Sequence, residues 1–117
     1  MKNTPSGISI SGDDIVAILS AFKLVDLFPI DTEEQAAFNR ICCKSASAKL
    51  LSHEQVFSAN ELRMLSAAVN CAYQYLSGHL PELQVSPKLR ADLIPHLFTY
   101  NRLSEYFERL IEQHNLR

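Results

Sequence analysis

A regular pattern of apolar and polar positions runs from Ser58 to Ser77. Its polar side chains recur every three or four residues: Arg63, Ser66, Asn70, Gln74 and Ser77. At roughly 100° per residue of helix they form one narrow stripe, and the other positions from 62 to 76 are apolar. A helix that is apolar on most sides is normally buried. The pattern therefore predicts a central helix that is covered by other helices or by a second copy of the chain.

The two ends of this helix are marked by local signals. Ser58 and Glu61 have the spacing of a capping box, in which each side chain accepts a hydrogen bond from the backbone N–H of the other residue. Phe57 and Leu62 flank the box as a hydrophobic staple. Gly78 suits the left-handed conformation that commonly follows a helix. We therefore expect one helix over 58–77.

An earlier helix is indicated by a second capping box, formed by Ser11 and Asp14. Because the residue before a proline avoids the helical conformation, we expect this helix to end at Phe28-Pro29. One face carries apolar residues at helical spacing: Ile15, Ile18, Leu19, Phe22 and Val25.

A third helix is expected to begin at Asp31-Thr32 and to end between Leu51 and His53. The residues from Cys42 to Ala48 are mostly small, which would let another helix approach closely. The expected core-facing positions are Ala37, Phe38, Ile41, Ser45 and Ala48.

The last helical stretch begins at Ser86-Pro87, where serine can cap the helix and proline fits its first position. Pro95 is expected to kink or split it near Leu93-Ile94, since a proline inside a helix removes a hydrogen bond and clashes with the preceding turn. Beyond it, apolar residues keep helical spacing: Leu97, Tyr100, Leu103, Phe107, Leu110 and Ile111.

These elements predict an all-α fold, an antiparallel bundle of four to five helices joined by short loops. Residues 1–10 are expected to form a flexible N-terminal arm, and residues 11–117 a single bundle domain.

Composition narrows the classes of partner. The 117 residues carry a net charge of −2, which gives no electrostatic basis for binding nucleic acid or an anionic membrane. No apolar run approaches the roughly 20 residues that span a bilayer, and the N-terminus has no secretory signal. Three cysteines without framework spacing are typical of free thiols in a reducing compartment. We therefore expect a cytoplasmic protein.

Candidate chemistry is sparse. Cys42 and Cys43 point about 100° apart on a helix and cannot easily share a metal, although Cys71 would add a third sulfur. Buried cysteine more often packs as a small apolar residue. The histidines lack metal-ligand spacing, and no nucleophile or phosphate-loop motif occurs. The sequence therefore predicts no cofactor, no metal and no catalytic residue, and favours a non-enzymatic protein.

The leading functional hypothesis is a small protein–protein interaction or regulatory bundle that associates with itself as a homodimer or with another protein. Polar residues of the 58–77 stripe and aromatic residues off the core spacing are the candidate interface positions: Asn70, Gln74, Phe98 and Tyr106.

Two alternatives remain open. The first is a ligand-binding or enzymatic bundle with a pocket near Pro95, lined by His96, Tyr100 and Cys71. The second is a DNA-binding regulator that uses the polar stripe of 58–77, although Arg63 is its only cation.

Overall fold

The computed structural model describes residues 10–27 and 32–116, and in these two ranges the regular elements are all helical. They comprise five α-helices and two short 3₁₀-helices: α1 (Gly12–Phe22), η1 (Val25–Leu27), α2 (Glu33–Leu51), α3 (Ala59–Leu76), α4 (Pro87–Leu93), η2 (Ile94–His96) and α5 (Leu97–Gln113). The all-α prediction is confirmed. Of the predicted arm, only Ile10 lies within the described residues, and it is partly buried against the core.

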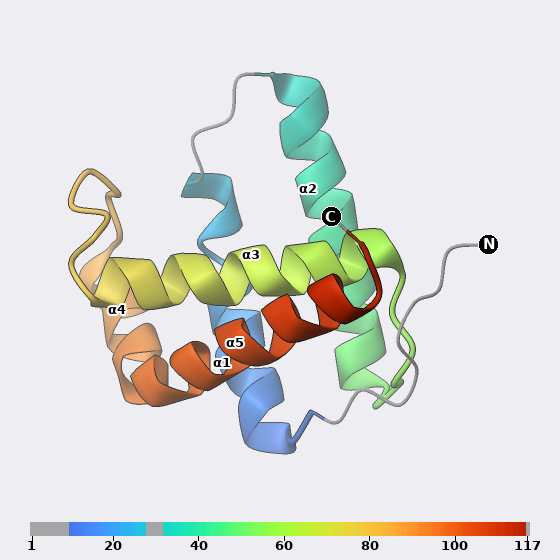
Figure 1. Ribbon diagram of the computed structural model, residues 1–117. Helices are drawn as coiled ribbons and strands as arrows, with labels where there is room; N and C mark the ends of the chain where they lie inside the picture. The colour runs from blue at the N-terminus through green and yellow to red at the C-terminus, as the bar shows by residue number, and fades with distance from the viewer. Residues whose placement is uncertain (1–9, 28–31, 117) are drawn as a thin grey trace.

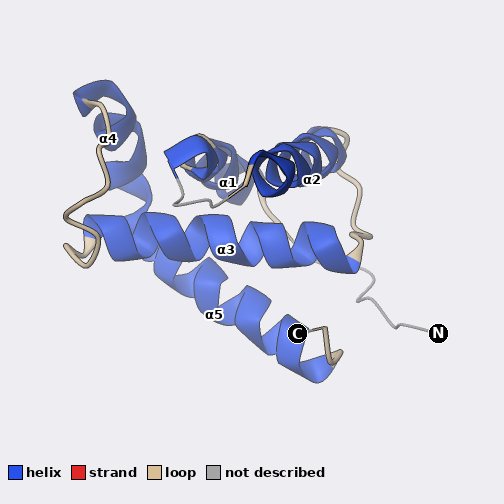
Figure 2. Cartoon of the chain, turned by 90° about the horizontal axis from the view of Figure 1, so that it is seen from above, coloured by secondary structure: helices blue, strands red, loops and turns tan. Residues whose placement is uncertain are grey.

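The helix α3 lies at the centre of the molecule. α1 and α2 lie side by side on one side of it, and α5 lies on the other (Figure 2). α5 runs antiparallel to α3 and packs along it, whereas α1 and α2 run antiparallel to each other and cross α3 (Figure 1). Among the described residues, no helix is both long and apolar enough to cross a membrane.

The central helix is shielded for most of its length, as the sequence predicts. Leu62, Leu65 and Val69 are fully buried, and Cys71 is half-buried. The last turn, from Tyr73 to Leu76, is only half-buried, so the shielding weakens toward the loop that precedes α4.

Both predicted capping boxes are present. The Ser58 hydroxyl accepts from the Glu61 N–H at 3.1 Å, and the Glu61 carboxylate accepts from the Ser58 N–H at 2.7 Å. The corresponding distances between Ser11 and Asp14 are 3.2 and 3.3 Å. Gly78 has φ of +84°, a conformation that glycine adopts without steric cost. Local sequence therefore suffices to set these helix ends.

Pro95 divides the last helical stretch, as predicted. α4 ends at Leu93, the 3₁₀-helix η2 contains the proline, and α5 begins at Leu97. The start at Ser86 is also confirmed, because its hydroxyl accepts from the Leu89 N–H at 3.2 Å.

The predicted end of the first helix is wrong. α1 ends at Phe22, and the chain tightens into η1 before reaching Phe28, which lies outside the described residues. Leu24 is fully buried and Val25 is 5% exposed, so the chain still packs in the core after α1 has ended. The N–H groups of Lys23, Leu24 and Leu27 bond to carbonyls three residues earlier, and such a tighter turn frequently closes an α-helix.

The predicted core face of α2 is also wrong. The buried positions are Asn39, Cys42, Ala46 and Leu50. Phe38 and Ile41, which were expected to face the core, are 45% and 66% exposed. The helix is thus turned by roughly 140° from the expected orientation. The physical reason is that α2 has apolar residues on both faces, so its spacing alone does not select one.

Candidate functional site

The outward face of α2 carries a row of residues at alternating spacings of three and four. We define the α2 outer surface as this row with one flanking aromatic residue: Glu34, Ala37, Phe38, Ile41, Lys44, Ala48 and Leu51. Ile41 is 66% exposed and Leu51 65%. Spacings of three and four repeat every seven residues, the pattern with which one helix packs along another in a coiled coil.

This exposure differs from the usual scatter of apolar residues on protein surfaces. Single exposed apolar side chains are normal, whereas adjacent ones on one face mark interaction sites. Phe38 and Ile41 are three residues apart on the same helix and therefore neighbours. The sequence contains this row of residues from 34 to 51, but the prediction from helical spacing places part of the row in the core.

The charges of α2 are distributed unevenly along the helix. Glu33 and Glu34 lie in its first turn, and Arg40 and Lys44 lie one turn apart near its middle. Like charges at this spacing destabilise a helix by roughly 0.2–0.5 kcal/mol. Within residues 10–27 and 32–116, neither Glu34 nor Lys44 takes part in an ion pair or side-chain hydrogen bond. An approaching acidic group would therefore relieve the repulsion between Arg40 and Lys44.

A buried carboxylate fixes α2 to the central helix. Glu61 is 4% exposed, and it accepts hydrogen bonds from Lys49 Nζ at 2.7 Å and from the Ser45 hydroxyl, in addition to the Ser58 N–H. Burial acts to raise the pKa of Glu61, but the hydrogen bonds from Lys49, Ser45 and Ser58 outweigh it, and the net pKa is lowered. The inner side of α2 is thus fixed to α3 by the bonds of Lys49 and Ser45 to Glu61, and the α2 outer surface lies on its opposite side.

The polar stripe of α3 lies against α5. Asn70 Oδ1 accepts from the Ser104 hydroxyl at 3.3 Å, and Ser66, which is 4% exposed, donates to Glu108 at 3.3 Å. Gln74 is half-buried. Two of the predicted interface residues, Asn70 and Gln74, therefore belong to the α3 stripe that α5 partly covers, and their part in an interface between chains remains a prediction.

A groove of about 300 Å³ follows this seam between α3 and α5. Its polar groups are bonded within the chain, since Arg63 donates to the Leu116 carbonyl and to Asn60. Arg63, the cation of the stripe, is thereby engaged in closing the C-terminal end of α5 onto α3. The lining residues are Arg63, Ser66, Ala67, Asn70, Glu108 and Ile111.

The two predicted aromatic interface residues have different surroundings. Phe98 is 85% exposed, and Ile94, four residues earlier, is 51% exposed. Tyr106 is partly buried against the core, with its ring centroid 5.5 Å from that of Phe107. Phe98 is thus an accessible apolar side chain, and Tyr106 is part of the packing of α5.

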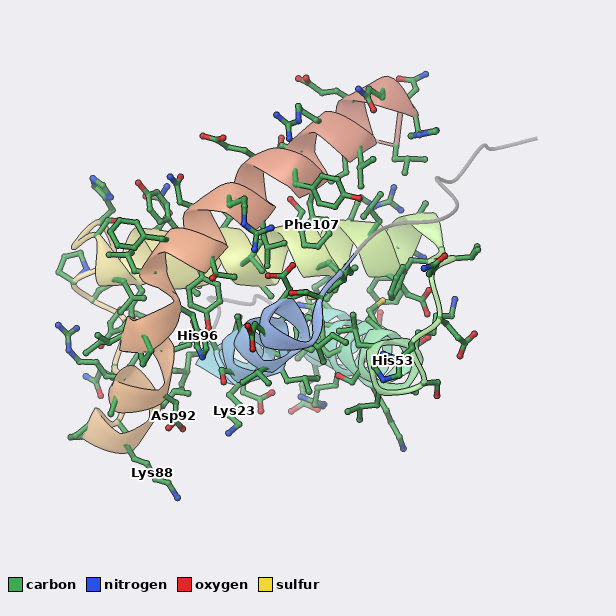
Figure 3. All side chains as sticks on the ribbon, turned by 90° about the horizontal axis from the view of Figure 1, so that it is seen from below. Lys23, His53, Lys88, Asp92, His96 and Phe107 are labelled. Atoms are coloured by element: carbon green, nitrogen blue, oxygen red, sulfur yellow. The ribbon has the colours of Figure 1, made fainter. Side chains whose placement is uncertain are left out.

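Two of the residues expected to line a pocket near Pro95, His96 and Tyr100, lie close together, and Tyr100 also links α5 to α1. Tyr100 is fully buried, and its hydroxyl donates to the Ala17 carbonyl of α1 at 2.8 Å. The His96 ring lies edge-on to it at 6.0 Å. Figure 3 shows His96 and Asp92 on the side of η2 and α4 that faces α1. Burial, with a smaller contribution from Asp92, raises the pKa of Tyr100 far above its ordinary value.

Replacing Tyr100 by phenylalanine is expected to lower the free energy of unfolding by about 1 kcal/mol, because the variant loses the hydrogen bond to Ala17 but keeps the ring. Urea unfolding measures the change. Tyr73→Phe serves as the matched control, since Tyr73 is only half-buried and its hydroxyl has no hydrogen bond to another residue within 10–27 and 32–116. An equal loss in both variants would contradict a specific role for the Tyr100 hydroxyl.

The three cysteines are free thiols. Burial raises the pKa of Cys43 and of Cys71 to about 11, and it also raises that of Cys42. The thiols are therefore protonated near neutral pH, which disfavours both nucleophilic attack and metal ligation. In the part of the chain that the structure describes, no group of three or more histidine, cysteine or acidic side chains is placed to hold a metal ion.

Comparison of the chain with protein-family models, with curated proteins and with solved structures finds no match. A proposal for its function therefore rests on the surface of the molecule itself.

Proposed function

We propose that this protein is a non-enzymatic interaction module that associates with a second copy of itself through the α2 outer surface. The observation that carries the proposal is the exposure of Phe38, Ile41 and Leu51 on the face of α2 that is turned away from the core. Burying these side chains against a partner would remove apolar area from water, which is the main driving force of protein association.

The shape of this surface favours a protein partner over a small molecule. Small ligands bind in concave sites that enclose most of their surface, whereas one side of a helix is convex. Seven-residue spacing is the usual signature of helix-on-helix contact. The net charge of −2 is small, so two copies would repel each other only weakly.

The Ile41→Glu variant is expected to be monomeric under conditions where the unaltered protein is dimeric, because it places a charge in the centre of the buried surface. Ile41 is 66% exposed in the single chain, so the variant should fold normally. Sedimentation equilibrium at protein concentrations up to about 100 µM covers the affinities expected of a small interface.

Phe98→Glu is the matched control. It introduces the same charge at an exposed apolar position on α5, and it is expected to leave the dimer intact. A monomer at every concentration of the unaltered protein would overturn the proposal. Dissociation by Phe98→Glu and not by Ile41→Glu would also overturn it and would assign the contact to the start of α5.

A further inference from the structure

We infer that the second copy docks with its own α2 antiparallel to the first, with the two-fold axis at the level of Asn39. This inference rests on the proposed function and adds the orientation and register of the contact. Its basis is the order of residues along the α2 outer surface, where an acidic position, Glu34, and a basic position, Lys44, flank Ala37 and Ile41.

The charges favour the antiparallel orientation. In a parallel pair in register, Glu34 would face Glu34 of the second copy and Lys44 would face Lys44, so both contacts would be repulsive. In an antiparallel pair the N-terminal part of one α2 lies beside the C-terminal part of the other. Glu34 of one copy can then meet Lys44 of the second copy. Because neither side chain is paired within the described residues, no existing ion pair must be broken.

The register follows from the spacing. With the axis at Asn39, a residue that lies a given number of positions after 39 faces the residue that lies the same number of positions before 39 in the second copy. Lys44 then meets Glu34, and Ile41 packs on Ala37, a large side chain against a small one, as close helix packing requires. Phe38 lies within one residue of the axis, where the two phenylalanine rings can contact each other.

The positions of the two charges, rather than the shape of the molecule, favour this half of the helix. α2 crosses behind α3, with its N-terminal half above α3 and its C-terminal end below it (Figure 1). The α2 outer surface is exposed on both sides of this crossing, at Ile41 and at Leu51, so α3 obstructs neither half. A register centred nearer the C-terminal end would pair Ile41 with Leu51 but leave Glu34 and Lys44 without partners.

Exchanging the two charges tests the register. Glu34→Lys alone and Lys44→Glu alone each create two repulsive contacts across the two-fold axis, and each is expected to weaken the dimer roughly tenfold at low salt. The double variant restores attraction with the signs reversed, so its dissociation constant should return to within about threefold of the unaltered protein. Sedimentation equilibrium measures the constants, at about 20 mM and about 500 mM salt, because screening should reduce the differences.

Two variants at exposed positions outside α2 provide matched controls for net charge. Glu105→Lys matches Glu34→Lys, and Lys88→Glu matches Lys44→Glu. Circular dichroism confirms that each variant is folded. Both controls are expected to dimerise as the unaltered protein does, and a weakening equal to that of the α2 variants would attribute the effect to net charge and overturn the inference.

The outcomes also separate this inference from the proposed function. A dimer that Ile41→Glu dissociates, but in which the double charge exchange does not restore affinity, would overturn the antiparallel register and leave the α2 surface as the contact. A protein that is monomeric at all concentrations would overturn both. We expect each single variant to weaken the dimer and the double variant to restore its affinity.

Discussion

Replacing Phe107 by alanine is expected to lower the free energy of unfolding by about 4 kcal/mol. Phe107 is fully buried where α5 packs on α3 (Figure 3). Its removal loses the transfer free energy of the ring and leaves a cavity. The helices cannot readily close that cavity, since Ser66 and Asn70 are bonded across the same seam. Urea unfolding followed by circular dichroism measures the change, which is a large part of the 5–15 kcal/mol that typically stabilises a domain.

Phe98→Ala is the matched control because it makes the same substitution on the same helix. Phe98 is 85% exposed, so its truncation should change the free energy of unfolding by less than about 0.5 kcal/mol. The comparison is made at low protein concentration, where any dimer is dissociated. A loss at Phe98 as large as that at Phe107 would contradict the packing of α5 on α3 described above.

Replacing Glu61 by alanine is expected to destabilise the protein by about 3 kcal/mol. The variant removes the acceptor of three donors: Lys49 Nζ, the Ser45 hydroxyl and the Ser58 N–H. It therefore removes both the cap of α3 and the link between α3 and α2. The effect should be smaller than that of breaking a fully buried ion pair, because the Lys49 side chain is 28% exposed and keeps part of its hydration.

The same carboxylate should make stability depend on pH. The folded state lowers the pKa of Glu61 below its ordinary value of 4.5, so the unfolded chain binds this proton more readily. The stabilisation is therefore fully present above about pH 5 and is lost as the pH falls through the folded-state pKa. Glu61→Gln should lose less stability than the unaltered protein between about pH 5 and pH 3.

An exposed carboxylate, Glu105, provides the control for this titration, and Glu105→Gln should keep the acid dependence of the unaltered protein. Urea unfolding at a series of pH values measures both variants. If the stability of Glu61→Gln falls with pH as steeply as that of the unaltered protein, the loss of stability in acid does not come from Glu61.

The capping boxes show which structural features the local sequence can predict. Ser11 with Asp14 and Ser58 with Glu61 are recognisable three residues apart, because both members of each pair lie in one helical turn. Each of these carboxylates also forms an ion pair with a distant helix, and the local sequence does not reveal that pair. Asp14 also pairs with Arg102 on α5, and Glu61 with Lys49 on α2. These partners are distant in sequence, so only the folded chain brings them together.

The polar stripe of α3 shows the same limit for the candidate site. Its helical spacing was correct, but Ser66 is buried beneath Glu108, whereas the neighbouring Ala67 is exposed. A hydroxyl can be buried when a partner accepts its hydrogen bond, and an alanine loses little by facing water. The spacing of polar residues therefore located the stripe, while the position of α5 decided which members are covered.

The sequence by itself determined the helices, the starts of α1, α3 and α4, and the division at Pro95, because caps and proline act within a few residues. The tertiary structure alone decided which side of α2 faces inward. Both sides carry apolar side chains, and the outward side carries the larger ones, Phe38, Ile41 and Leu51, so apolar burial alone does not explain the choice. The choice depends on Ala46, whose small side chain allows close approach, and on Ser45 and Lys49, which reach Glu61. The remaining apolar side is the α2 outer surface.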